Sequence, residues 1–216
     1  MLHTGINEID TFFENTLNRG YLLDIFGKNS TGKTQLLFQI ICNEIKNGNN
    51  VLYIDTNSEF RPERILEILK DRNLNSDLLK KISVHRVFNT SEQINSTVNI
   101  KKNFYSLIAI DNITDLFSYE YSNEKKLQEK NQLFSTYISD LSKFSIINNI
   151  PIVMTNMIRE FNGNEYENMS NILDQYTHVK IHLSKLNNII NCNISLPFIN
   201  KIFLLKISNL GLEKIS

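Results

Sequence analysis

At residues 27–34 the chain reads Gly27-Lys28-Asn29-Ser30-Thr31-Gly32-Lys33-Thr34. This stretch fits the pattern G-x-x-x-x-G-K-[ST], in which the two glycines allow backbone turns that a Cβ would obstruct. In a loop of this kind, successive N–H groups point inward beside a helix N-terminus, where the helix dipole also favours an anion. The stretch therefore predicts a phosphate-binding loop between a strand and a helix.

Two side chains of this stretch carry specific chemistry. Lys33 can reach the β- and γ-phosphates of a nucleotide, and the Thr34 hydroxyl can ligate Mg²⁺. The flanks agree, because Tyr21–Phe26 is apolar like a buried strand and Gln35–Lys46 has the apolar spacing of a helix. The alternative is a glycine-rich turn that binds no ligand. We predict that the nucleotide is bound by Gly27, Lys28, Asn29, Ser30, Thr31, Gly32, Lys33, Thr34 and Gln35.

Strand-like and helix-like segments alternate along the chain, which is typical of an α/β fold with a parallel sheet covered by helices. Strands are expected at Tyr21–Phe26, Val51–Asp55, Ile82–Val87, Tyr105–Asp111 and Ile152–Thr155. Helices are expected at Gln35–Lys46, at Glu63–Lys70 after Pro62, from Thr90, and after the polar stretch Ser118–Asn131 through Ile147. Beyond a polar segment, Ile158–Asn171, an antiparallel extension of the sheet is expected at Thr177–Leu183, Ile189–Leu196, Ile202–Ile207 and Leu212–Ile215.

The composition limits the classes of protein to consider. The 216 residues carry 23 Lys and Arg against 23 Asp and Glu, so any nucleic-acid site must be local rather than a general basic footprint. Two cysteines do not make a disulfide framework, which favours a reducing compartment. The N-terminal residues Met1–Gly5 are not a signal peptide, and no apolar run is long enough to span a bilayer. We therefore expect no membrane partner.

Ligand sites in such sheets lie at the carboxyl ends of the parallel strands. Besides the phosphate loop, the segments that fall there are Asn57–Arg64, Asp111 and Asn156–Met157. Asp111 ends an apolar strand, where a carboxylate can complete a magnesium site together with Thr34. The alternative for Asp111 is an ordinary helix N-cap. With the phosphate loop upstream, we predict that Thr34 and Asp111 hold the metal ion.

Seven segments resemble landmarks of the RadA-type recombinases of the RecA superfamily. They span the entry into the ATPase core, the segment after the second strand, the sensor strand and the C-terminal end. In chain order they are Thr4–Asp10, Val51–Thr56, Phe60–Arg64, Val87–Thr90, Thr155–Asn156, Leu196–Pro197 and Gly211–Glu213. The resemblance covers nearly the whole chain.

The resemblance implies a RecA-like P-loop ATPase core that binds ATP and Mg²⁺. We expect residues 1–216 to form this single domain, without the N-terminal helical DNA-binding domain and the polymerisation linker of full recombinases. A core that begins at this point is similar to the archaeal RadB-type paralogues. Because RecA-type nucleotide sites lie at subunit interfaces, the resemblance also implies a dimer or a hetero-oligomer.

Two positions depart from the family pattern. The family has a glutamate that activates the attacking water two residues after the Asp55 position, and here this residue is Asn57. An amide cannot accept a proton at neutral pH, and loss of such a base costs roughly 10²- to 10⁴-fold in rate. The family's sensor glutamine is Met157, whose thioether is a weak acceptor. Glu59 is a candidate substitute base, with a solvated loop charge as the alternative.

The resemblance also assigns a role to Arg64, at the family position that stacks on adenine, a task that suits a planar guanidinium. The alternative is a surface charge on a helix.

The DNA-binding loops of the family are poor in cations in this chain. Ser118–Lys126 resembles the first loop, but Ser118 and Glu124 stand where two arginines are expected. Each phosphate contact needs a cation, so we expect weak binding of single-stranded DNA. The remaining candidate contacts are Lys125, Lys126, Lys130 and, in the second loop Ile158–Asn171, Arg159.

Three hypotheses follow. The first is a mediator that binds ATP, hydrolyses it slowly or not at all, and assists a RadA-type recombinase or another recombination or repair protein. The second is an active DNA-dependent ATPase, with Glu59 or a residue of a neighbouring subunit as the base. The third is a regulatory RecA-like ATPase that does not act on DNA. The first two place the protein in the cytoplasm at the nucleoid, or in the nucleus of a eukaryote.

Overall fold

The computed structural model describes residues 2–14, 20–98, 100, 104–161, 163–196 and 199–215. In this part of the chain the strands form one sheet in the order β10-β9-β8-β7-β1-β5-β4-β2-β3, with β6 paired to β5. The strands are β1 Leu22–Gly27, β2 Val51–Asp55, β3 Ile82–Arg86, β4 Leu107–Asp111, β5 Ile152–Phe161, β6 Asn164–Glu167, β7 Val179–Leu186, β8 Ile189–Leu196, β9 Ile199–Ser208 and β10 Gly211–Lys214.

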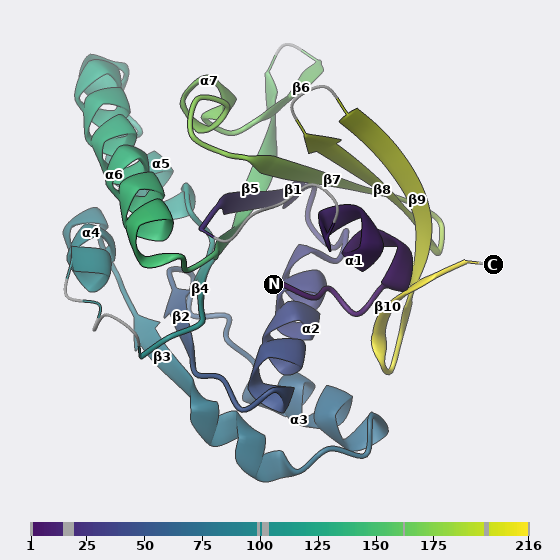
Figure 1. Ribbon diagram of the computed structural model, residues 1–216. Helices are drawn as coiled ribbons and strands as arrows, with labels where there is room; N and C mark the ends of the chain where they lie inside the picture. Colours follow the sequence, from purple (N-terminus) through teal and green to yellow (C-terminus); the bar gives the residue numbers. More distant parts are fainter. Residues whose placement is uncertain are drawn as a thin grey trace.

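The helices cover both faces of this sheet (Figure 1). They are α1 Asn7–Glu14, α2 Lys33–Lys46, α3 Pro62–Asp71, α4 Thr90–Val98, α5 Asp115–Glu120, α6 Leu127–Asn148 and α7 Ser170–Leu173, with short 3₁₀ helices η1 Ser76–Lys81 and η2 Glu124–Lys126. No helix among the described residues is long and apolar enough to cross a membrane.

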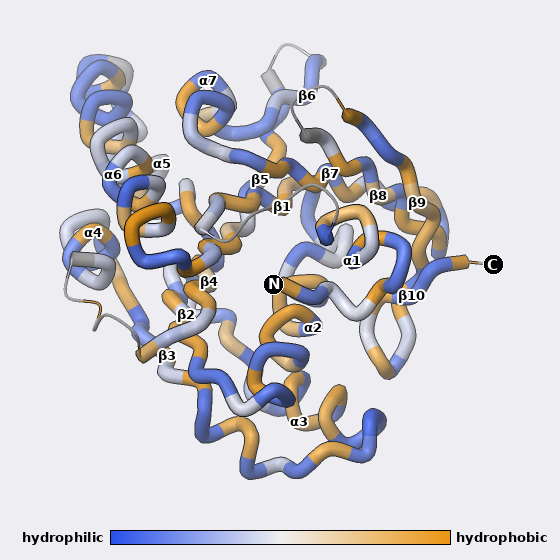
Figure 2. Tube along the Cα trace, in the orientation of Figure 1, coloured by the Kyte–Doolittle hydropathy of each residue, from blue (hydrophilic) through white to orange (hydrophobic). Residues whose placement is uncertain are grey.

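Two hydrophobic cores lie on opposite faces of the sheet. One packs side chains of α1, α2 and α3 against alternate residues of the strands, such as Leu23 and Ile25 of β1. The other packs α5, α6 and α7 against the remaining strand residues, such as Leu22 of β1 and Ile152 of β5. Because both faces are covered, the central strands are largely apolar, as Figure 2 shows for β4, although β5 becomes polar toward its end.

The sheet is parallel from β3 through β7, because β7 runs parallel to β1. Among the described strands, β6 is antiparallel to β5, and β8, β9 and β10 are each antiparallel to the strand before them. The mostly parallel sheet with a C-terminal antiparallel extension is confirmed, but the extension begins at β8 and not at the strand expected at Thr177–Leu183. The chain passes through α7 between β5 and β7, and such a crossover delivers the next strand in parallel.

The two segments expected to be polar loops are partly structured. Ser118–Glu120 forms the last turn of α5, because the buried Phe117 packs its ring against Phe134 and Tyr137 of α6. The segment Ile158–Asn171 contains the end of β5, the paired strand β6 and the start of α7. Pro197, part of one resembling pair, lies outside the described residues.

Candidate functional site

The phosphate loop has a compact geometry that requires its glycines. A Cβ on Gly27 would lie 2.2 Å from the carbonyl oxygen of Leu183 and 2.8 Å from Thr31 Oγ1. Gly32 has a φ of +99° and immediately precedes α2, which begins at Lys33 rather than at Gln35 as the sequence predicted. The Thr31 hydroxyl closes the loop by donating to the carbonyl of Lys28 at 2.9 Å. The loop is therefore tightly closed, and a side chain at position 27 would not fit without a shift of the backbone.

Lys33 points back into this loop. Its Nζ donates to the carbonyl oxygens of Gly27 at 3.0 Å and Lys28 at 2.8 Å, and the side chain is buried. Burial lowers the pKa of the Lys33 ammonium, while the charges of Asp111, Asp115 and Glu59 act in the opposite direction. A buried cation bonded only to neutral carbonyls is well suited to exchange those bonds for charged phosphate oxygens.

Asp111 lies at the carboxyl end of β4, where it gathers three hydroxyl donors. Thr34 Oγ1 donates to its Oδ2 at 3.0 Å and Tyr53 OH donates to the same atom at 2.8 Å. Thr155 Oγ1 makes a short hydrogen bond to Oδ1. Tyr53 and Thr155 are contacts that sequence reasoning missed. β2 and β5 flank β4, but no motif in the sequence gives their register.

The pair Thr34 and Asp111 fits one type of metal site. Among the described residues, no cluster of three or more His, Cys, Asp or Glu side chains is arranged to hold a metal ion. Mg²⁺ commonly takes one or two protein oxygens and completes its octahedron with water and phosphate oxygens. A hydroxyl and a carboxylate 3.0 Å apart beside a phosphate loop match that donor set.

The turn after β2 brings Asn57 and Glu59 together. Asn57 Nδ2 donates to Glu59 Oε2 at 3.1 Å, and the backbone N–H of Glu59 donates to Asp55 Oδ1 at 3.1 Å. Ser58 between them has a φ of +59°. Glu59 is exposed and its charge acts on Lys33, so a carboxylate is present near the phosphate loop although position 57 carries an amide.

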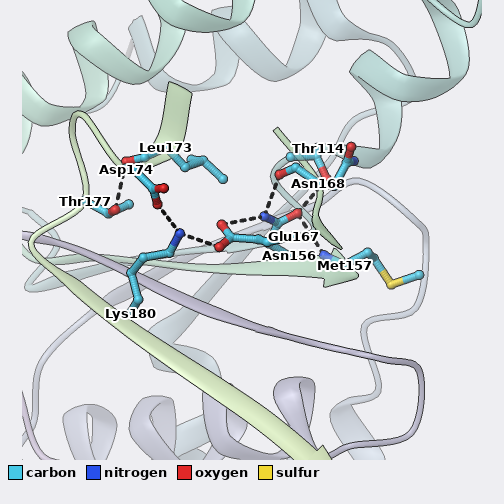
Figure 3. Close-up of polar contacts among 9 residues, drawn as sticks. All are labelled: Thr114, Asn156, Met157, Glu167, Asn168, Leu173, Asp174, Thr177 and Lys180. Carbon is cyan, nitrogen blue, oxygen red and sulfur yellow. Dashed lines mark hydrogen bonds and ion pairs between the residues drawn. The ribbon is translucent and has the colours of Figure 1, made fainter. Parts of the chain in front are cut away.

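Asn156 at the sensor position is buried and fully bonded (Figure 3). Its Oδ1 accepts from the Thr114 hydroxyl and from the Met157 N–H, both at 2.8 Å. Its Nδ2 donates to the carbonyl of Asn168 at 2.9 Å and to Glu167 Oε1 at 3.2 Å. The half-buried Met157 side chain points away from these contacts in Figure 3.

The sequence matches the Rad51 family over residues 1–186. The chain belongs to the Rad51 family. It is similar to the DNA repair and recombination protein RadA of Cenarchaeum symbiosum (strain A), with 30% identity over 169 residues. The matched part is 73% of this chain and 42% of that RadA, so the chain spans less than half the length of this relative. The family confirms the RadA-type resemblance and the RecA-like α/β core.

In this Rad51-family chain, Arg64 is held beside the phosphate-loop helix. Its Nε donates to Gln35 Oε1 at 2.8 Å, and its other nitrogens bond Glu67 Oε2 at 2.8 Å and the carbonyl of Ser208 at 3.1 Å. The structure thus brings together Arg64 and Gln35, both predicted site residues. The guanidinium joins α2, α3 and β9 at the edge of the loop.

The four candidate DNA contacts divide into two groups. Lys130 and the exposed Arg159 lie close enough that the charge of Arg159 adds to burial in lowering the pKa of Lys130. Lys125 and Lys126 are exposed in η2, and Lys126 Nζ lies 5.8 Å above the Tyr121 ring. Arg159 also lines a groove with Asp115, whose negative charge repels the phosphates of a nucleic acid.

Sequence reasoning also missed the acidic groups around the loop. Asp115 begins α5, and burial raises the pKa of its carboxyl while Arg159 acts to lower it. Glu165 of β6 forms an ion pair with Lys28, across a cleft of about 410 Å³ between the phosphate loop and the β5–β6 hairpin. No motif marks these residues, because each reaches the loop only through the fold of the chain.

Proposed function

We propose that this protein binds ATP with Mg²⁺ at the phosphate loop and acts as an accessory factor in recombination or DNA repair, with slow or no ATP hydrolysis. The observation that carries the binding part is the 3.0 Å hydrogen bond between Thr34 and Asp111, beside the buried Lys33. The recombination part is supported by the Rad51 family and by the similarity to a RadA named for DNA repair and recombination.

The roles of the residues follow from their chemistry. The backbone N–H groups of the loop and the Lys33 ammonium bind the phosphates, which replace the Gly27 and Lys28 carbonyls as partners of Nζ. Thr34 and Asp111 hold Mg²⁺, which neutralises phosphate charge when it is bound. The planar guanidinium of Arg64, fixed by Gln35, stacks on the adenine ring.

Slow hydrolysis is supported by the two positions that depart from the family. The Asn57 amide has no proton affinity at neutral pH, and its Nδ2 donates to Glu59. The Met157 thioether offers no donor to a γ-phosphate oxygen. In this proposal ATP acts as a structural ligand, which at a hundredfold excess over Kd adds about 2.7 kcal/mol to the folded state.

A second function, an active DNA-dependent ATPase, is favoured by one observation. The Glu59 carboxylate lies near enough for its charge to act on Lys33, so it is a base candidate at the correct edge of the sheet. A residue supplied by a neighbouring subunit would serve the same role. Single-stranded DNA would bind weakly to Lys125, Lys126, Lys130 and Arg159.

We further propose that the partner is a RadA-type recombinase or another repair protein, and that the chain works as a dimer or hetero-oligomer. The site is open at the carboxyl edge, where Lys28 and Glu59 are exposed and accessible to a second subunit. Its place of action would be the cytoplasm at the nucleoid, or the nucleus in a eukaryote.

The deciding experiment measures ATP turnover and ATP binding by the purified protein, with and without single-stranded DNA. Lys33→Ala serves as the blank and Lys46→Ala, an exposed lysine at the end of the same helix, as the matched control. We expect calorimetric binding of ATP·Mg²⁺ by the parent and Lys46→Ala, no binding by Lys33→Ala, and turnover at the level of the blank. DNA-stimulated turnover above the blank would contradict the accessory role.

Glu59→Ala distinguishes the two functions. Loss of measurable turnover in Glu59→Ala, with turnover retained in Glu63→Ala, supports the DNA-dependent ATPase. Glu63 is a suitable control because it is an exposed glutamate in the first turn of α3, close in sequence to Glu59. Equal turnover in both variants supports the accessory factor.

A further inference from the structure

A cluster of charged side chains lies under the β5–β6 hairpin and α7, on the sheet face opposite α2. Asp24 of β1 lies beside Lys180 of β7 in register. Glu167 ends β6 and Asp174 follows α7. The side chain of Lys180 forms ion pairs with both Glu167 and Asp174 (Figure 3). One ammonium group therefore serves the carboxylates of two segments that cover the sheet.

Asp24 is the third carboxyl group of this cluster. The residue is completely buried, and neither carboxyl oxygen has a hydrogen bond of ordinary length and angle to the described residues, although the side chains of Asn156 and Glu167 lie close enough to interact with it. Burial, and next the charge of Glu167, hold the pKa of the Asp24 carboxyl well above its usual range. With one lysine facing three carboxyl groups, burial favours the protonated form of Asp24, while Lys180 and Asn156 act in the opposite direction.

The cover over Asp24 consists of the β5–β6 hairpin and α7, and few polar contacts hold the hairpin in place. Besides the two ion pairs of Lys180, the contacts are the hydrogen bonds from Asn156 to Glu167 at 3.2 Å and to the Asn168 carbonyl at 2.9 Å. The Asn168 N–H also donates to the Met157 carbonyl at 2.8 Å. Glu165 adds its exposed ion pair with Lys28. These contacts of the hairpin are polar, so water that enters can replace them, whereas α7 is also held by Ile172 and Leu173, which are buried in the core.

We propose that Asp24, Glu167 and Lys180 form a proton-linked latch that holds the β5–β6 hairpin against the sheet. When the hairpin lifts, water reaches Asp24, and the O–H bond of its carboxyl group breaks to give a carboxylate and a solvated proton. Docking takes this proton up again. Rising pH therefore favours the open state, and the docked population changes by up to tenfold per pH unit while one proton is linked.

The other charged groups around Asp24 have different pH effects. His182 of β7 stacks on Phe26, and burial lowers its pKa, so acid favours the open state through this residue. The pH dependence that His182 gives to opening is therefore opposite in sign to that given by Asp24. Glu165, Glu167 and Asp174 are matched by Lys28 and Lys180, which stay charged near neutral pH. The effect of Asp24 is therefore isolated by comparing the parent with the variants at each pH.

The test is hydrogen exchange of the backbone amides of residues 158–161 and 163–168 between pH 6 and pH 8, expressed as protection relative to intrinsic rates. In the parent and in Glu160→Gln, a charge control on the same hairpin, we expect protection to fall by up to tenfold per pH unit. In Asp24→Asn we expect protection that does not fall with pH. His182→Asn should keep the fall and make it steeper.

A second variant keeps the latch testable if Asp24→Asn does not fold. Glu167→Gln keeps an acceptor for Asn156 but loses the ion pair with Lys180, so hairpin protection at pH 6 should drop and depend less on pH. Equal pH dependence in the parent, Asp24→Asn and Glu167→Gln would overturn the latch. These measurements use no nucleotide, and their outcome is separate from that of the proposed ATP site.

Discussion

The phosphate loop, the turn after β2 and the middle of β5, which runs on to Phe161 instead of ending near Thr155, differ in their polar groups. Lys33, Thr34 and Asp111 are buried or joined by hydrogen bonds, as a site for phosphate and Mg²⁺ requires. After β2, the amide of Asn57 takes the place of the family's glutamate. Within β5, the thioether of Met157 takes the place of its glutamine. In the proposed function, binding and hydrolysis therefore depend on separate segments, and one can be lost without the other.

The difference also concerns rigidity. Asp111 accepts three hydroxyl hydrogen bonds from three separate elements, so its place is over-determined. Glu59 is exposed and held by a turn of its own segment. A base must be placed within hydrogen-bond reach of a water, and an exposed turn does this less reliably than a strand end.

The largest change is expected from restoring a carboxylate after β2. Asn57→Glu should raise ATP turnover by roughly 10²- to 10⁴-fold, because a general base returns beside an otherwise complete phosphate site. Single-turnover kinetics with saturating ATP measures this directly. Asn57→Gln, with the same length and no charge, is the control and should stay at the parent rate. If Asn57→Glu stays there as well, the missing base is not the limiting defect.

A smaller effect is expected from removing the carboxylate of the metal pair. Asp111→Asn should weaken ATP affinity in Mg²⁺ by about 10- to 100-fold, the value of a charged hydrogen-bonding group, and leave affinity in a chelator unchanged. Calorimetry in the two buffers gives both numbers. Asp115→Asn removes a charge that also acts on Lys33 but makes no contact with Thr34. A similar loss in Asp115→Asn would mean that the general field, and not the metal ligand, is responsible.

The sensor position should contribute less than the base. Met157→Gln adds one donor near the γ-phosphate, worth about 1.4 kcal/mol, or about tenfold in turnover on the Asn57→Glu background. On the parent background it should be undetectable, because the base is still missing. The comparison of the two backgrounds is a double-mutant cycle. A tenfold gain on the parent background would show that another group already acts as the base.

The phosphate loop and the end of β4 were predictable because each depends on adjacent residues, whereas β5 continues to Phe161 beyond the end expected at Thr155. Gly27, Gly32 and Lys33 form a continuous pattern, and Asp111 directly follows an apolar run. By contrast, Tyr53 and Thr155 reach Asp111 only through the register of three strands, which no local pattern encodes. The predicted roles of Glu59 and Arg64 stay predictions, since position alone does not test them.

The hairpin shows a different limit. β6 and the end of β5 pair although both are polar, so neither the alternation of a half-buried strand nor an apolar run marks them. The direction of β7 was also not readable, because a strand pattern carries no polarity. Asp24 lies within an apolar run of sequence, and Glu167, whose charge acts on it, lies far along the chain. Buried charge clusters of this kind are tertiary features and become visible only in the folded structure.

The smallest effect is expected where the hairpin meets the loop. Lys28 and Glu165 form an ion pair in which both side chains are about half exposed, so solvent screens the pair and it contributes little to stability. Glu165→Gln frees Lys28 for phosphate and should tighten ATP binding by less than about fivefold, with Glu160→Gln as the charge control on the same hairpin. Because salt screens an exposed pair, the gain should vanish near 1 M salt. A gain that persists in high salt, or equals that of Glu160→Gln, would mean that Glu165 acts through the position of the hairpin rather than through the Lys28 charge.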